Sequence, residues 1–233
     1  MRLCVLQSAF TTPFDNFRND PARFVPEHDC AHHFIHRDSA AQQVAALVRS
    51  GDFDVFINLC DGAADSDEAG IDVVRALERL GAAFTGADSR FYEPTREAMK
   101  LAARACGVAV PREVCAHDID AVERAHRSLR YPLLVKHPNS YGSIGMTRGS
   151  RVVTRAELHA EVARFLATFG GALIEEFIDG PEFTVLVAED PNNAAEPVAF
   201  VPTRLQFPPG ETFKHFDLKF VGFESVTSQP VDD

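Results

Sequence analysis

Short apolar runs alternate with amphipathic stretches along the first third of the chain. Four runs have the length and composition of buried strands: residues 3–6, 30–37, 53–59 and 82–85. Between them, apolar residues recur three or four positions apart. This period predicts one helix that begins at Ser39 and ends at Gly51, and another over residues 68–80 that ends at Gly81. Ser39 and Gln42 have the spacing of a capping box at the start of the first helix. Strands that alternate with helices predict an open parallel sheet, and we expect this domain to cover residues 1–94.

The pattern is mixed after residue 94. Residues 95–106 have the period of a helix, and capping boxes predict two further helices, one at Asp120 with Glu123 and one at Thr154 with Glu157. The apolar runs expected to form strands here are residues 108–115, 131–135, 151–153, 172–174, 182–187 and 197–204. Helices and strands therefore continue to the end of the chain without the regular alternation of its first third.

Lys136 ends one of these apolar runs and precedes a loop of small residues. A lysine at the end of a buried strand is costly unless an anion meets it. The loop holds Gly142 and Gly145, which permit a positive φ and let backbone N–H groups turn toward an anion. Lysine and loop together indicate a polyphosphate grip, although neither common phosphate fingerprint is present. The alternative is an ordinary turn beside a solvated lysine.

Lysine is rare in this chain, because only four of its 23 basic residues are lysines. They are Lys100, Lys136, Lys214 and Lys219. A chain that uses arginine for general surface charge can keep lysine where a compact point charge is needed. The alternative is codon bias with chance leftovers.

Residues 175–187 read as a hairpin with a turn at residues 179–181. Glu175 can accept a hydrogen bond from an exocyclic amine, and the backbone of residues 176–178 offers an edge to a purine ring. Glu182 can accept hydrogen bonds from ribose hydroxyls. The alternative is a plain hairpin with exposed carboxylates.

Three ordered segments resemble the ATP-grasp superfamily, and within it the branch similar to D-alanine–D-alanine ligases. VKHPNSYGSIGM (residues 135–146) resembles VKP-x-x-x-GSS-x-G-[MVI], and IEEFIDGPEFTV (174–185) resembles [IL]EE[FY]I-x-G-x-E[FY]TV. Residues 54–86 resemble the segment D-V-x-F-N-x-x-H-G…L-E-x-x-G-x-x-[FY]-T-G. The resemblance covers about residues 50–220 and implies an α/β fold. A Rossmann-like parallel-sheet domain would precede an ATP-grasp domain of two α+β lobes, residues 95–171 and 172–233, the second truncated.

The resemblance implies a role for each matching residue. Lys100 and Lys136 would hold the α- and β-phosphates of ATP, and Lys219 would face the γ-phosphate, with Lys219 and Ser143 as the catalytic residues. The loop residues expected to close over the β- and γ-phosphates are Ser140, Gly142, Ser143 and Gly145. The residues expected to frame adenosine are Glu175, Glu176, Phe177, Ile178 and Glu182.

The implied reaction is an ATP-dependent ligation of a carboxylate to an amine. A carboxylate attacks the γ-phosphate to give an acyl phosphate and ADP, and an amine then displaces phosphate. The implied partners are small molecules: ATP, an amino acid or other carboxylate, and an amine. Such chemistry depends on dispersed positive charge and positioning more than on a covalent nucleophile.

The chain departs from the family pattern in places. Gln7 and Ser8 stand where the ligases carry Gly-Gly-x-Ser, and Cys60 or Asp61 stands where they tend to have histidine. Lys214, Phe216 and Phe220 replace tyrosines, which removes the hydroxyl groups at those positions. The resemblance therefore leaves the pair of substrates open.

Magnesium is the second cofactor that the resemblance implies. The ligases supply its ligands from an Asp and a Glu-x-Asn segment well after the position of Lys219, whereas residues 221–233 contain no such motif. We assign no metal ligand here and expect the ligands in a missing C-terminal part. Two hypotheses stay open: a ligase whose C-terminal part is absent, and a non-catalytic or split nucleotide-binding module. An NAD-dependent oxidoreductase is a distant third, since no glycine fingerprint follows the first strand.

Composition narrows the class of protein. The 233 residues are 45% hydrophobic and 24% charged, as in globular proteins, and the net charge of −11 argues against nucleic-acid or anionic-membrane partners. No apolar run has the length of a membrane span, and five scattered cysteines without a CxxC motif indicate a cytoplasmic protein. His28, Cys30, His32, His33 and His36 could be a metal cluster or one strand's alternating faces. A homodimer stays open.

Overall fold

A computed structural model describes residues 1–9, 20–62, 68–139, 142–193 and 195–231. The chain forms two compact units, Met1–Met99 and Lys100–Asp233. Helix α3 (Arg96–Ala105) begins in the first unit and ends in the second. Short 3-10 helices occupy Pro21–Arg23, Arg37–Ser39, Arg148–Ser150 and Phe223–Ser225.

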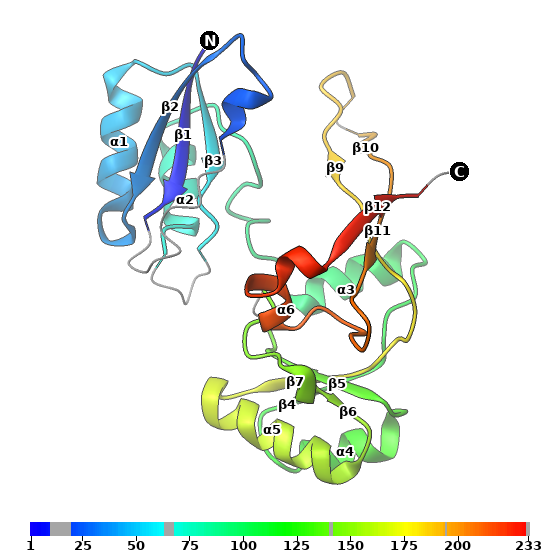
Figure 1. Cartoon of the computed structure of the whole chain (residues 1–233). Helices are drawn as coiled ribbons and strands as arrows, with labels where there is room; N and C mark the ends of the chain where they lie inside the picture. Colours follow the sequence, from blue (N-terminus) through cyan, green and yellow to red (C-terminus); the bar gives the residue numbers. More distant parts are fainter. Residues whose placement is uncertain (10–19, 63–67, 140–141, 194, 232–233) are drawn as a thin grey trace. The chain divides into compact units, whose positions relative to one another are not determined.

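The first unit contains a parallel sheet of three strands, as the alternating pattern predicts. Strands β1 (Arg2–Ser8), β2 (Asp29–Ile35) and β3 (Val55–Leu59) are arranged in the order β2-β1-β3. Helices α1 (Ala40–Ser50) and α2 (Ile71–Arg79) pack against each other and bury their apolar faces in the same core (Figure 1). The central strand β1 is almost completely buried because it has a neighbour on both edges.

Three sequence predictions in this unit are wrong in detail. The strand predicted at residues 82–85 is a single bridge between Phe84 and Phe56, because Gly86, with φ of 99°, turns the chain away. The predicted capping box at Ser39 is absent, since that hydroxyl contacts Gln43 rather than the helix backbone. Helix α2 begins at Ile71, because Gly70 instead forms a backbone bridge with Gly62.

The histidines of the first unit have contacts of their own. His32 Nε2 lies 3.3 Å from Asp20 Oδ1, and the His33 ring packs edge-on against Phe53 at 5.6 Å. Within the described part of the chain, no group of three or more His, Cys, Asp or Glu side chains is arranged to hold a metal ion. None of the described helices has the length and apolar character needed to cross a membrane.

The second unit is built on an antiparallel sheet of four strands. Strands β4 (Glu113–Ala116), β7 (Ala172–Glu176), β5 (Leu133–Lys136) and β6 (Arg151–Val152) follow one another in that order. Helices α4 (Ala121–Ser128) and α5 (Arg155–Phe169) lie side by side against this sheet (Figure 1). The core between them includes Leu133, Val135, Ile174, Leu158 and Phe165, all fully buried.

The helix starts of this unit follow the sequence only in part. Thr154 caps α5 as predicted, because its hydroxyl accepts a hydrogen bond from the Glu157 N–H at 3.2 Å. The Glu157 carboxylate accepts from Val153 N rather than closing the box on Thr154. At α4 the predicted cap Asp120 makes no cap bond, and Asp118 accepts from Ala121 N instead. The bend before α4 thus selects the earlier aspartate.

A second, thinner sheet follows in sequence. Strands β12 (Thr227–Pro230), β11 (Thr203–Gln206) and β8 (Glu182–Thr184) form an antiparallel sheet in that order. The short strands β9 (Val187–Ala188) and β10 (Val198–Ala199) pair separately, so the strand predicted at residues 197–204 is divided in two. Helix α6 (Phe216–Phe220) precedes β12.

The hairpin predicted at residues 175–187 is wrong. Strand β7 pairs with β4 on one edge and β5 on the other, so neither edge is open to β8. Strand β8 pairs with β11 instead and belongs to the other sheet. The turn at Asp179-Gly180-Pro181 therefore carries the chain from one sheet to the next.

Candidate functional site

Four charged side chains meet on one face of the four-stranded sheet. In the β4–β7 pairing Glu113 lies opposite Glu175, and in the β5–β7 pairing Lys136 is the diagonal neighbour of Glu175. Residues paired or alternating in this way share a face of a sheet. Lys100 on α3 reaches the same group and contacts both carboxylates. Sequence positions 100, 113, 136 and 175 are thus brought together.

Each lysine is enclosed and paired. The exposed fractions of the side chains are 12% for Lys100, 15% for Lys136 and 5% for Glu175. Lys136 Nζ contacts Glu175 Oε2, and Lys100 Nζ contacts Glu175 Oε1. Burial alone raises the pKa of the Glu175 carboxyl, but the charges and hydrogen bonds of Lys136 and Lys100 hold it below its usual value. Glu175 is therefore an ionised group between two cations.

The neighbouring Glu176 points to the other side of strand β7. Its carboxylate accepts hydrogen bonds from the Arg130 backbone N–H and from Arg130 Nη2, both at 3.0 Å. The side-chain hydrogen bond from Arg130 lowers the pKa of Glu176. The next residue, Phe177, donates its N–H to Pro132 O at 2.9 Å. These bonds fix the backbone at the end of β7, beyond which Ile178 is exposed.

The glycine loop after β5 is held by hydrogen bonds at Ser143 and Gly145. Ser143 has a positive φ of 59°, and its hydroxyl donates to Lys214 O at 2.7 Å. Gly145 O accepts from Arg164 Nη2 at 2.7 Å, and a Cβ at Gly145 would lie 2.5 Å from the Phe169 ring. Gly142 also has a positive φ, of 66°, and lies against the Phe220 ring. Ser140, predicted to belong to this loop, lies outside the described residues.

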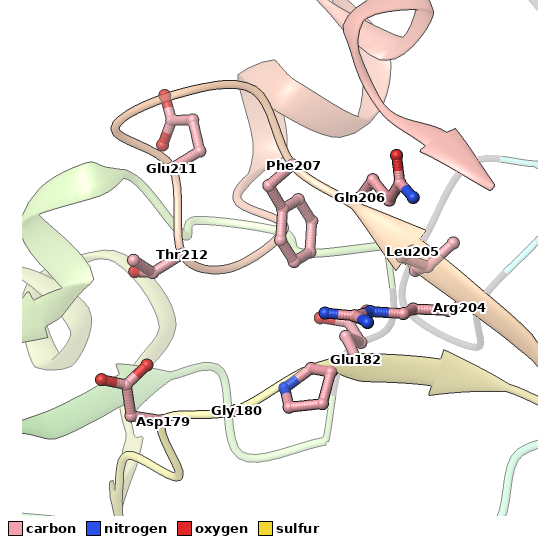
Figure 2. Close-up of a pocket in the computed structure, with 10 residues that line it drawn as sticks. Asp179, Gly180, Glu182, Arg204, Leu205, Gln206, Phe207, Glu211 and Thr212 are labelled. Carbon is pink, nitrogen blue, oxygen red and sulfur yellow. The ribbon is translucent and has the colours of Figure 1, made fainter. Parts of the chain in front are cut away.

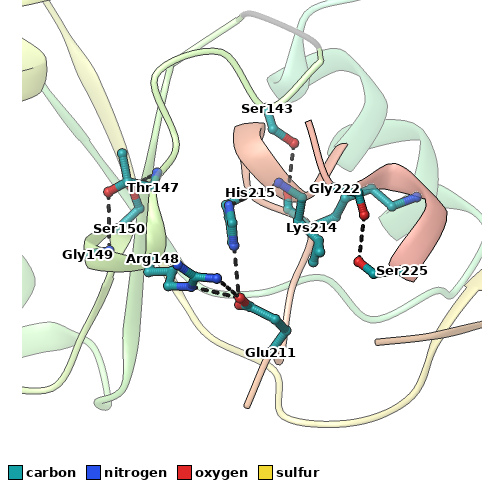
Figure 3. A network of polar contacts seen from close by, with 11 residues as sticks. Ser143, Thr147, Arg148, Gly149, Ser150, Glu211, Lys214, His215, Gly222 and Ser225 are labelled. Atoms are coloured by element: carbon teal, nitrogen blue, oxygen red, sulfur yellow. Dashed lines mark hydrogen bonds and ion pairs between the residues drawn. The ribbon is translucent and has the colours of Figure 1, made fainter. Parts of the chain in front are cut away.

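A second polar network joins Arg148, which follows the loop, to Glu211 and His215. His215, 1% exposed, places Nε2 3.2 Å from Glu211 Oε2, and Arg148 Nε donates to Glu211 Oε1 at 2.7 Å (Figure 3). The hydrogen bond from Arg148 has the largest effect on the Glu211 carboxyl and lowers its pKa. The hydrogen bond from His215 acts in the same direction, while burial opposes both. His215 Nδ1 accepts from Leu218 N at 3.3 Å and so caps helix α6. This network positions Lys214 and Lys219.

Lys219 lies on helix α6, and Glu182 lies on strand β8 of the second sheet. Lys219 is exposed as a residue, yet partial burial of its ammonium and the nearby charge of Lys214 lower its pKa, while Glu182 opposes the change. Glu182 also lines a cavity of about 440 Å³ together with Asp179, Arg204 and Phe207 (Figure 2). The lining of this cavity does not include Lys100 or Lys136. Their ammonium groups lie against carboxylates, so we build the candidate site on the ion pairs.

Sequence reasoning found most of this constellation and missed two parts. Glu113 stood within a predicted strand, where its only signal was a carboxylate among residues expected to be buried. Glu211, His215 and Arg148 gave no signal, because their positions 148, 211 and 215 are joined only by the fold. The arrangement as a whole can offer two enclosed ammonium groups and a glycine loop to an anion.

Comparison with known proteins gives a family for this arrangement. The family model described as D-ala D-ala ligase C-terminus matches residues 101–228. A D-alanine–D-alanine ligase of Marinomonas sp. is 26% identical over 190 residues, which cover 80% of this chain and 56% of that protein. The D-alanine–D-alanine ligase of Cupriavidus necator is 32% identical over 167 residues, which cover 69% of this chain and 48% of that protein. The chain spans about half the length of these curated relatives.

Solved structures agree on the fold. D-alanyl-alanine synthetase A from Vibrio cholerae has a TM-score of 0.67 at 12% identity, covering 97% of this chain and 73% of that one. The D-alanine–D-alanine ligase from Bacillus anthracis, complexed with ATP, has a TM-score of 0.65 at 14% identity, covering 100% and 71%. At these identities the likeness shows a shared mixed α/β fold.

Proposed function

This chain belongs to the D-alanine–D-alanine ligase family, and from that premise we propose that it takes part in an ATP-dependent ligation of a carboxylate to an amine. The observation that carries the proposal is the convergence of Lys100 and Lys136 on Glu175. Two enclosed lysines from different elements contribute little to the hydrated charge that keeps a protein surface soluble. They fit a site that binds a polyanion.

The residues present fit the phosphates of ATP. The ammonium groups of Lys100 and Lys136 already contact carboxylate oxygens, which are anionic acceptors like phosphate oxygens. Phosphate oxygens can therefore replace or share these contacts without a new kind of partner. In the proposed complex these lysines hold the α- and β-phosphates, and the loop with Gly142, Ser143 and Gly145 covers the β- and γ-phosphates.

The adenosine end is assigned to the chain that leaves strand β7. Glu175 stays ionised and can accept a hydrogen bond from an exocyclic amine, while the backbone of residues 176–178 faces the purine edge. Phe177 N is already bonded to Pro132 O, so it contributes to holding this backbone in place. Glu182 would accept from the ribose hydroxyls. Glu176 contributes through its main chain, because its carboxylate is bound to Arg130.

The transferred phosphate is assigned to Lys219. The lowered pKa of this lysine reflects partial burial and the adjacent charge of Lys214, conditions in which binding an anion is favoured. Ser143, held on Lys214 O, would keep the loop beside the segment that carries Lys219. ATP supplies the phosphoryl group that activates the carboxylate; these side chains position it and balance its charge. Magnesium is part of the proposal, without ligands assigned here.

Two measurements test this function. Calorimetry on the 233-residue chain is expected to detect ATP binding. An ADP-release assay over a panel of amino acids, run on a full-length protein that includes the expected magnesium ligands, is expected to show ADP formation that depends on the amino acid. Absence of ATP binding would reject the site. ATP binding with no ADP formation under any condition would reject the ligase activity and leave a nucleotide-binding module.

A further inference from the structure

Two carboxylates lie directly opposite each other at the proposed phosphate site. Glu113 on β4 and Glu175 on β7 are cross-strand partners, and their side chains are only 22% and 5% exposed. Like charges in this arrangement repel each other. Lys100 Nζ contacts Glu113 Oε2 and Glu175 Oε1 and so neutralises the repulsion. The pair of carboxylates thus depends on a lysine that the proposed function assigns to a ligand.

We propose that Glu113 is a positioning residue that holds Lys100 in place and competes with nucleotide phosphates for it. This inference rests on the proposed function. Lys100, Lys136, Glu113 and Glu175 carry two positive and two negative charges, so the group has no net charge to offer a polyphosphate. Glu175 also has an assigned role toward adenine. Glu113 has none, and its described contact is with Lys100.

The Glu113 carboxylate is expected to lower the affinity of the site for polyphosphates. Phosphate oxygens that approach Lys100 come close to the Glu113 carboxylate, and the repulsion acts in a partly enclosed site where water screens it weakly. Glu113 therefore weakens the grip on ATP and on other polyphosphates. Because the repulsion applies equally to a bound nucleotide product, it also favours release.

Substitution of Glu113 is a cleaner test than substitution of Lys100. Removing Lys100 would delete the phosphate contact and leave Glu113 and Glu175 facing each other, so two effects would be mixed. Glu113→Gln keeps the side-chain shape and removes the charge. Glu113→Asp keeps the charge. Asp120→Asn removes one exposed charge beside α4, which packs on the opposite face of the four-stranded sheet. Thermal unfolding of each full-length variant checks its fold.

The probes are ATP, inorganic tripolyphosphate and adenosine, each titrated by calorimetry or ligand-observed NMR. Glu113→Gln is expected to bind ATP and tripolyphosphate on the order of tenfold more tightly than the wild type. Adenosine, which has no phosphate, is expected to bind equally to both. Glu113→Asp and Asp120→Asn are expected to remain within about twofold of the wild type for ATP.

Each other outcome overturns a distinct statement. Equal or weaker ATP binding by Glu113→Gln, with wild-type binding intact, rejects the competition while leaving the proposed function standing. A gain for adenosine as large as that for ATP also rejects it, because the effect would be structural. A wild-type chain that binds neither ATP nor tripolyphosphate rejects the proposed function, and the inference is rejected with it.

Discussion

The two sides of strand β7 carry the same residue type with opposite surroundings. Glu175 meets Lys100 and Lys136, whose side chains are 12% and 15% exposed, whereas Glu176 meets Arg130, 82% exposed, and Arg112, 63% exposed. In both cases the cations lower the pKa of the carboxyl. The two lysine side chains are largely removed from water, whereas the two arginine side chains keep most of their hydration. We infer that the lysine side is arranged for a ligand and the arginine side ties the chain together.

The largest expected effect separates the two sides by ligand binding. Lys136→Ala removes a compact charge at the end of β5 and is expected to weaken ATP binding about 100-fold. Arg112→Ala removes the same charge from the other side and is expected to leave the affinity unchanged. Calorimetry on both variants is the measurement. Equal ATP affinity of Lys136→Ala and the wild type would mean that the lysine side binds no phosphate.

The next effect separates the two sides by stability. Glu175→Gln removes the charge shared by two enclosed lysines and is expected to lower the free energy of unfolding by about 3 kcal/mol. Glu176→Gln is expected to cost less, because its arginines remain hydrated and the amide oxygen can still accept from Arg130 N. Urea unfolding followed by circular dichroism gives both values. A larger loss for Glu176→Gln would reverse the comparison.

Acid is expected to reduce the stability difference between the wild type and Glu175→Gln. The folded-state pKa of Glu175 is below its usual 4.5, so its stabilising contribution is complete above about pH 4.5 and is lost as the pH falls through the folded-state value. The stability gap between wild type and Glu175→Gln is therefore expected to narrow as the pH falls below about 4.5. Salt should reduce the contribution of Glu176 more than that of Glu175, because exposed pairs are screened. A gap independent of pH would contradict the ion pairing.

The smallest effect is a predicted absence of change. Glu176→Gln is expected to bind ATP within about twofold of the wild type, because the proposed adenine contact uses the main chain and the side chain faces Arg130. The titration used for Lys136→Ala serves here as well. A large loss of affinity would show that the arginine side also acts on the ligand.

Local pattern predicted well wherever neighbours in the sequence decide the outcome. The helix predicted to begin at Thr154, the Thr154 cap and the apolar run ending at Lys136 are confirmed, because a helix cap and a short β-run depend mainly on residues close together in the sequence. The capping boxes predicted at Ser39 and Asp120 are wrong. The Ser39 hydroxyl contacts the Gln43 side chain, and Asp118 rather than Asp120 accepts the hydrogen bond from Ala121 N. Cap choice depends on how the preceding loop enters the helix, which residue spacing alone does not encode.

The sequence by itself determined the elements of the four-stranded sheet, the family and the identity of the charged residues that serve it. Only the tertiary structure decided that residues 175–187 divide between two sheets, that Glu113 shares Lys100 with Glu175, and that His215 rests on Glu211. The physical reason is the distance along the sequence over which each interaction acts. A strand or helix is set by side chains a few positions apart, whereas a buried charge is paired by whichever opposite charge the folded chain brings into reach.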